Sequence, residues 1–145
     1  MSPEDRSYVA ALVDVFGRLR ARDVRGSRLP EVTIQGSRID ALDWLANITG
    51  VRVSVIGKDY TRHQCSEHCP DKHTRIAATT RRWQVTGARA TILLHDIEPY
   101  MRVQGRQARA LVQEGSVVGV KPPVVREMKR LGWSTDWLTD PPTVQ

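Results

Sequence analysis

Residues 2–22 have the sequence SPEDRSYVAALVDVFGRLRAR, and the period of the hydrophobic residues changes within this stretch at Gly17. Ser2 precedes Pro3 and two acids, a combination that favours the start of a helix. The apolar positions that follow cover nearly the whole circumference of this helix as far as Phe16. After Gly17 polar and apolar residues alternate, as is typical of a strand. The segment therefore predicts a buried helix that passes directly into a strand with a cationic face.

The same periodicities predict further strands and helices along the chain, in the order αββαββα. Residues 1–114 form the main domain, with a loop inserted at 57–74, and residues 115–145 form a linker, a short helix and a tail. The expected elements are a strand at 31–35, a helix capped by Ser37 and closed by Gly50, a strand at 51–55 with Val51, Val53 and Val55 inward, a strand at 75–85, and helices at 87–97, 100–113 and 124–131.

The length of 145 residues and the hydrophobic content of 40% predict one globular domain with a core of its own. The longest apolar runs, such as Val9–Val13, are far shorter than the ~18 to 20 residues that cross a bilayer. The N-terminus also lacks the basic and apolar segments of a secretory signal. We therefore expect a cytoplasmic protein with no membrane partner.

The charge of the chain is strongly basic and is carried mainly by arginine. Lys and Arg together number 22 against 16 acids, which gives a formal charge of +6, and all but four of the cations are Arg. The planar guanidinium binds phosphates and base edges well, so this bias favours nucleic acid as a partner. A GC-rich coding sequence would produce the same bias, so the placement of the arginines has to decide between the two interpretations.

Two stretches resemble the LAGLIDADG homing endonuclease family. Residues 9–17, VAALVDVFG, align with its signature nonapeptide, and residues 83–111 contain WQVTG, a helix, PYM and a basic helix in the family's order. The resemblance covers roughly residues 6–114 and implies an α+β, LAGLIDADG homing-endonuclease-like αββαββα saddle with an extended hairpin loop and a C-terminal helix and tail. In that architecture two units meet through their first helices, and their sheets form one concave surface in the DNA major groove. A chain with a single motif then has to form a homodimer.

The resemblance places cationic and hydrogen-bonding side chains on the surface that faces DNA. Side chains of this kind contact phosphates and guanine edges. For the three alternating arginines after Gly17, an ordinary solvated sheet face is the alternative interpretation. The candidate DNA-binding residues are Arg18, Arg20, Arg22, Thr33, Gln35, Arg38, Arg52, Arg75, Arg81 and Arg82.

The first helix carries the candidate dimer contacts, which are Tyr8, Ala10, Ala11 and Val13. Small residues on a helix let two backbones approach each other closely, and this helix is apolar on more faces than one core can cover. The alternative is that Ala10 and Ala11 pack inside the monomer.

The catalytic acid that the family uses is missing. Family members bind the divalent metal through a carboxylate at the second acidic position of the nonapeptide, and here that position is Phe16, which cannot ligate a cation. Asp14 matches the first acidic position but points about 200° away around the helix axis. Gln104 stands where lysine is common, whereas Arg38 matches a basic residue of the catalytic surround. We therefore expect a degenerate site without catalytic residues or catalytic magnesium.

Residues 61–73, TRHQCSEHCPDKH, contain both cysteines and three of the four histidines. Thiolate and imidazole are the ligands that zinc prefers, and four of them form a closed structural site. A loop of chance composition or a labile disulfide is the alternative. The predicted zinc ligands are Cys65, Cys69, His73 and His68, with His63 as the alternative fourth ligand.

Three functions follow from these observations. The leading hypothesis is a homodimeric protein with a structural zinc that binds double-stranded DNA without cutting it; the family's occurrence implies a regulator encoded by a phage or mobile element and acting in the host cytoplasm. The second is a nuclease that has rebuilt its metal site from Asp14 or Asp23, or that needs an acid from a partner chain. The third is an interaction module whose arginines bind an acidic host protein.

Overall fold

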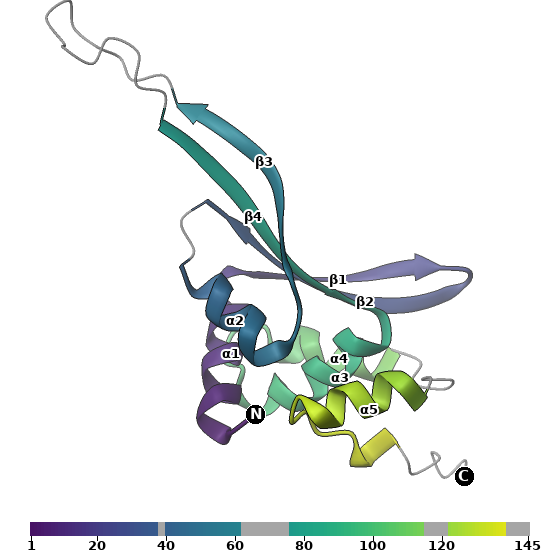
Figure 1. Cartoon of the computed structure of the whole chain (residues 1–145). Helices are drawn as coiled ribbons and strands as arrows, with labels where there is room; N and C mark the ends of the chain where they lie inside the picture. The colour runs from purple at the N-terminus through teal and green to yellow at the C-terminus, as the bar shows by residue number, and fades with distance from the viewer. Residues whose placement is uncertain (38–39, 62–75, 115–121, 139–145) are drawn as a thin grey trace, which may run out of the picture.

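The structure, a computed structural model, describes residues 1–37, 40–61, 76–114 and 122–138. Its elements follow the predicted order αββαββα and continue with further helices, so the predicted α+β fold class is confirmed (Figure 1). The elements are α1 (Pro3–Phe16), β1 (Gly17–Val24), β2 (Ser27–Gly36), α2 (Ala41–Thr49), β3 (Val53–Thr61), β4 (Ile76–Thr86), α3 (Gly87–Ile97), the 3-10 turn η1 (Glu98–Tyr100), α4 (Gly105–Glu114), α5 (Pro122–Arg130) and the 3-10 turn η2 (Asp136–Leu138).

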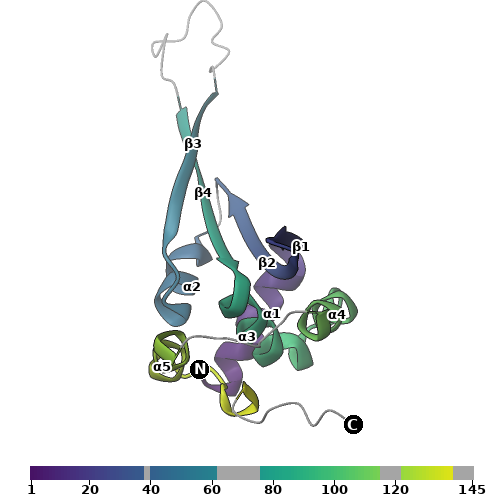
Figure 2. The same cartoon turned by 90° about the vertical axis from the view of Figure 1, so that its right-hand side faces the viewer.

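The four strands form one antiparallel sheet in the order β1-β2-β4-β3. The two hairpins meet through β2 and β4 and diverge as two arms, while the helices lie together on one side of the sheet (Figures 1 and 2). Side chains alternate between the faces of a strand, so where the helices cover the sheet every second residue enters the core and the others point to the opposite, open face. This open face is available for binding.

Helix α1 begins with a complete capping box and ends without any linker before β1. The Ser2 hydroxyl accepts from the Asp5 amide, while the Asp5 carboxylate accepts from the Ser2 amide. At the other end, a Cβ on Gly17 would lie 2.4 Å from the Val13 carbonyl oxygen. Only glycine fits where the chain turns so sharply from helix into strand. The predicted boundary at Gly17 is therefore confirmed.

The core lies between the sheet and the helices. Trp83 of β4 is fully buried, and its indole N–H donates to the Thr49 hydroxyl at 3.2 Å. That hydroxyl in turn donates to the Leu45 carbonyl at 2.6 Å, so the hydrogen-bonding groups of this buried cluster have partners. Val32 and Ile34 of β2 pack inward beside Trp83, as their alternation predicts.

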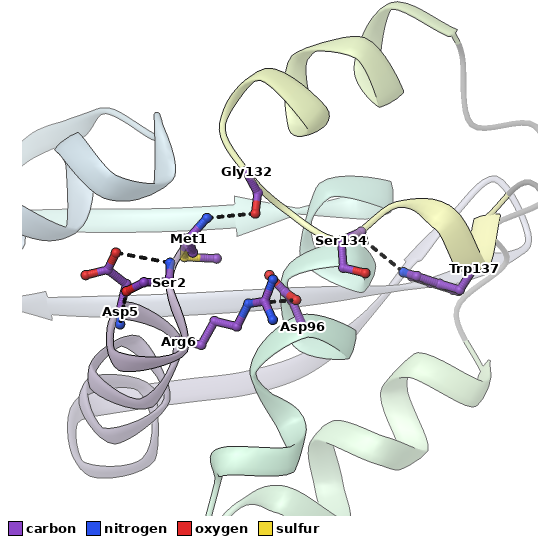
Figure 3. Close-up of polar contacts among 8 residues, drawn as sticks. All are labelled: Met1, Ser2, Asp5, Arg6, Asp96, Gly132, Ser134 and Trp137. Carbon is purple, nitrogen blue, oxygen red and sulfur yellow. Dashed lines mark hydrogen bonds and ion pairs between the residues drawn. The ribbon is translucent and has the colours of Figure 1, made fainter.

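The C-terminal segment packs against the same core and contacts the start of the chain. Trp133 is buried, and Trp137 stacks on His95 of α3 with ring centroids 4.0 Å apart. The N-terminal ammonium donates to the Gly132 carbonyl at 2.7 Å, as Figure 3 shows. Nearby, Arg6 and Asp96 form an ion pair, visible in the same figure, in which Asp96 is nearly buried. Burial raises the pKa of Asp96, and the neighbouring Arg6 guanidinium opposes that rise.

The first half of the chain differs from the prediction in the cap of α2, in the exposure of Val55 and in the extent of β3, which continues to Thr61 into the loop predicted at 57–74. Ser37 does not cap α2: β2 continues to Gly36, and α2 begins at Ala41 with Asp40 as its N-cap residue. Val55 was expected to point inward and is 61% exposed instead. It shares the helix side of the sheet with its cross-strand partner Arg81, but it lies outside the packed core and beside a register shift between Val55 and Gly57.

The helix predicted at 100–113 begins later, because residues 101–104 have a non-helical conformation between η1 and α4. The backbone amides of Arg102, Val103 and Gln104 donate hydrogen bonds to the Asp14 carboxylate instead. The helices predicted at 87–97 and 124–131 are present as α3 and α5. Across the described ranges, no helix combines the length and apolar character needed to cross a bilayer.

Candidate nucleic-acid interface

The open face of the sheet gathers most of the described candidate DNA-binding residues. Arg18, Arg20 and Arg22 alternate with the inward-facing Leu19 on β1. The strand register places Thr33 of β2 directly across from Arg18. Cross-strand partners share a face, so the three β1 arginines and the polar side chains of β2 and β4 belong to one surface.

A shallow hollow lies over this face, and polar side chains form most of its wall. The Arg82 guanidinium donates to the Gln35 side-chain carbonyl at 3.4 Å, which links β4 to β2 across the hollow. Arg52 is also exposed and lies beside Gln84 in a neighbouring depression. The residues that line the main hollow are Phe16, Arg18, Arg20, Ala21, Arg22, Glu31, Thr33, Gln35, Arg82 and Gln84.

Arg81 does not belong to this surface, and its assignment as a DNA contact is wrong. It neighbours Arg82 on β4 and therefore points to the opposite side of the sheet. There its guanidinium forms an ion pair with Asp43 of α2 at 2.8 Å. Two other candidates, Arg38 and Arg75, lie outside the described residues.

Glu31 also lies on this face, although it was not among the residues predicted to bind DNA. It lies on β2 directly opposite Arg20, and its side chain is only 9% exposed. Its carboxylate oxygens lie 3.9 Å from the Arg20 guanidinium and 4.0 Å from that of Arg22. The alternation of β2 already placed Glu31 on the polar face, but its burial between two arginines depends on the strand register.

Phe16 and Asp14 occupy different surroundings at the end of α1. The Phe16 ring is 51% exposed and lines the hollow of the open face. The Asp14 carboxylate points away from that hollow and accepts hydrogen bonds from the amides of Arg102, Val103 and Gln104. Partial burial raises the pKa of Asp14, but the three amide donors outweigh it and hold the pKa below the ordinary 3.8.

The Gln104 side chain contributes further contacts to the same junction. Its side-chain amide nitrogen lies 3.0 to 3.1 Å from the carbonyl oxygens of Val13, Asp14 and Gly17. The Val13 carbonyl also accepts from the Gly17 amide, so Gln104 adds a second donor there, and it bridges the last turn of α1 to the first residue of β1. Asp14 and Gln104 thus join the end of α1 to the segment that leads into α4. Asp23, the other proposed replacement acid, is 83% exposed near the end of β1.

The predicted dimer contacts on α1 fall into two groups. Ala10 and Val13 are completely buried within the chain, so the prediction is wrong for these two residues. Their side of the helix faces the chain's own core. Tyr8 and Ala11 are exposed, and the Tyr8 ring meets the Trp44 ring edge-on with centroids 4.7 Å apart. Only part of the broad apolar surface of α1 is therefore used inside the chain.

The predicted zinc ligands Cys65, His68, Cys69 and His73, with the alternative His63, lie outside the described residues. The structure describes the strands on either side of them, and Thr61 pairs with Ile76. Within the described ranges, no group of three or more His, Cys, Asp or Glu side chains is arranged to hold a metal ion.

The fold is homing-endonuclease-like. The archaeal intron-encoded homing endonuclease I-Vdi141I, solved in complex with DNA, superposes with a TM-score of 0.50 over 88% of this chain and 77% of that chain. The two sequences are 14% identical, so the likeness concerns the fold alone. Neither a family model nor a curated protein sequence matches the chain.

Replacing Asp14 with asparagine should destabilise the protein, because the amide carries no charge for the three backbone donors. We expect a loss of about 1 to 2 kcal/mol in the free energy of unfolding near pH 7. The folded-state pKa is lowered, so this contribution is present above the unfolded pKa of Asp14 and disappears as the pH falls through the folded pKa. Urea unfolding of wild type and Asp14→Asn between about pH 7 and pH 3 measures the gap, which should close on acidification.

Asp23→Asn is the matched control, because it makes the same chemical change at an exposed position. Its stability should follow that of the wild type at every pH. Equal stability of Asp14→Asn and wild type at neutral pH would contradict the structural role of Asp14.

Proposed function

We propose that this chain binds double-stranded DNA through the open face of its sheet, as a homodimer, and leaves the DNA uncut. The observation that carries the proposal is the clustering of Arg18, Arg20, Arg22 and Arg82 around one hollow of a sheet face that the helices leave open. The likeness in fold to I-Vdi141I, an endonuclease solved in complex with DNA, supports DNA as the partner. The proposed role of this chain in regulating a phage or mobile element rests on the resemblance to the LAGLIDADG family.

The chemistry of this face suits a DNA groove. The hollow combines guanidinium groups with the neutral hydrogen-bonding side chains of Thr33, Gln35 and Gln84. Guanidinium groups neutralise phosphates and contact guanine, whereas amides and hydroxyls contact base edges or the backbone. The two hairpin arms follow an extended path, and a two-stranded ribbon fits the width of the major groove (Figure 1).

The absence of cleavage follows from the end of α1. The position that carries the metal-binding acid in the LAGLIDADG family is occupied by the exposed ring of Phe16. The nearest acid in the motif, Asp14, already accepts three backbone hydrogen bonds on the other side of the helix. Recruiting it as a metal ligand would break the junction with α4, so it is unsuited to replace the missing carboxylate.

The homodimer is supported by an apolar stripe on the exposed side of α1. Tyr8, Ala11 and Val15 follow one another at helical spacing, and Val15 is 70% exposed. Tyr100 and Val103 extend this apolar surface beyond η1, and Val103 is 77% exposed. A two-fold dimer would cover this surface with the same surface of a second copy and join the two open faces into one.

Binding should depend steeply on salt, because arginines that contact phosphates release counterions. With 6 to 10 phosphate contacts, the affinity for plasmid DNA should fall about 10³-fold to 10⁵-fold between about 50 and 200 mM salt. Arg18→Ala combined with Arg82→Ala should weaken binding about 10-fold or more and reduce the salt slope by roughly one for each side chain. Gel-shift titrations with and without magnesium measure affinity and cleavage together.

The control removes the same charge from the helical side, by Arg126→Ala combined with Arg130→Ala on α5, and should retain most of the affinity. Binding that ignored salt, or equal losses in both double variants, would contradict binding through the open face. Nicked DNA that appears only with magnesium would show that the chain cuts.

Val15→Glu should convert the dimer to a monomer, because it would place two carboxylates against each other in an apolar interface. Sedimentation velocity at micromolar concentration should show half the wild-type mass. Val55→Glu is the control, since Val55 is similarly exposed but lies on the β3 arm. A Val15→Glu protein that remained dimeric would place the interface elsewhere.

We also propose a structural zinc between the described ends of the β3–β4 hairpin. Both cysteines and three histidines follow Thr61 and precede Ile76, and the pairing of these two residues brings the ends of that segment together. Ligands confined to one short connection give a metal site a small entropic cost of closure. A zinc there would stiffen the arm beside the open face.

Metal analysis of the purified protein should find one zinc per chain. Cys65→Ser and Cys69→Ser should each lose it, and His95→Ala, which changes the remaining histidine, should retain it. Thiol titration after chelation should recover two free thiols per chain. A disulfide in place of these thiols, or no zinc in the wild type, would overturn the metal site.

A further inference from the structure

Glu31 is an unexpected component of a surface that binds a polyanion. Among the described residues that line the hollow, four are arginines and Glu31 is the one acid. Its carboxylate is directed at the guanidinium groups of Arg20 and Arg22, at 3.9 and 4.0 Å. The arginine side chains remain 61% and 66% exposed, whereas that of Glu31 is 9% exposed. The acid therefore lies behind the two arginines, and their outer surfaces stay open to a ligand.

A carboxylate in this position treats phosphates and bases differently. A phosphate bound by Arg20 or Arg22 would bring a second negative charge close to a nearly buried one, and the two would repel each other. A guanine edge presents two acceptors and no net charge, so it gains the guanidinium hydrogen bonds without that repulsion. The carboxylate also restrains two long side chains, which reduces the conformational entropy lost when they bind.

We propose that Glu31 is a specificity-determining positioning residue, which holds Arg20 and Arg22 for guanine edges and disfavours their use on phosphates. The inference rests on the proposed function and deepens it, because it assigns separate tasks to the arginines of one surface. Arg82 has the neutral Gln35 as its partner, and within the described residues no carboxylate is paired with it to oppose contact with a phosphate. Duplex sites that contain guanine are the ligands that this arrangement selects.

A selection from a library of randomised DNA duplexes tests the assignment. The wild type should enrich guanine at one or two positions in each half-site. Glu31→Gln should bind unselected DNA about 3-fold to 10-fold more tightly near 50 mM salt, because a negative charge has been removed from the surface. Its preference for the selected duplex over one with those guanines replaced should fall about 10-fold.

Arg20→Lys provides a second test that does not depend on the fold tolerating a change at Glu31. Lysine keeps the positive charge but lacks the planar fork that binds guanine through two hydrogen bonds. Affinity for unselected DNA should stay within about 2-fold of wild type, while the guanine preference is lost at the position that Arg20 contacts. Asp23→Asn is the control for charge, because it removes an exposed acid from the same hairpin and should leave the preference unchanged.

The outcomes separate this inference from the proposed function. A wild-type protein that binds no duplex at low salt would overturn the proposed function and this inference together. If the wild type binds and both variants keep its guanine preference, only the role of Glu31 and Arg20 is overturned. A Glu31→Gln protein that loses affinity equally for all duplexes would show a purely structural role for the acid and would also overturn the proposal.

Discussion

The junction at the end of α1 is the constraint on which the rest of the structure depends. The helix passes into β1 at Gly17 with no intervening residue, so the direction of the helix determines where the first strand lies. Asp14 and Gln104 hold this junction against the start of α4 through backbone amides on one side and backbone carbonyls on the other. The Asp14 carboxylate accepts from amides that precede α4, and the Gln104 side-chain amide donates to carbonyls where α1 meets β1.

This junction gives positions 14 and 16 of the chain different structural roles. Asp14 has a task inside the folded chain, because three amides depend on its charge. The side chain at position 16 points to the open face and supports nothing behind it, so an aromatic ring there leaves the fold intact. The two positions therefore differ in kind: a change at Asp14 removes hydrogen bonds within the chain, whereas a change at position 16 alters the open face of the sheet.

The sequence predicts those features that depend on local periodicity and fails where tertiary contacts decide. The helix and strand order, the boundary at Gly17 and the inward side of β2 all follow from apolar spacing. Val55 has the spacing of an inward residue but lies outside the packed core, and the local pattern does not reveal where the core ends. Likewise, residues 101–104 look helical in isolation, yet their amides bind Asp14, a residue almost ninety positions earlier. Long-range hydrogen bonds of this kind override propensity.

The surface residues show the same division. The alternation of β1 correctly places its three arginines on one face, whereas Arg81 and Arg82 were both assigned to DNA although neighbouring residues of a strand point to opposite faces. A shift of one residue reverses the face of every side chain on a strand.

A count of charges alone would treat every acid on a basic surface as weakening the affinity for DNA. In the role proposed for Glu31, position matters more than number: a nearly buried carboxylate behind two guanidinium groups would lower their attraction for a phosphate and favour uncharged acceptors. A surface arranged in this way has a lower affinity for phosphates. Because phosphate contacts do not distinguish one duplex from another, the affinity that is lost is non-specific.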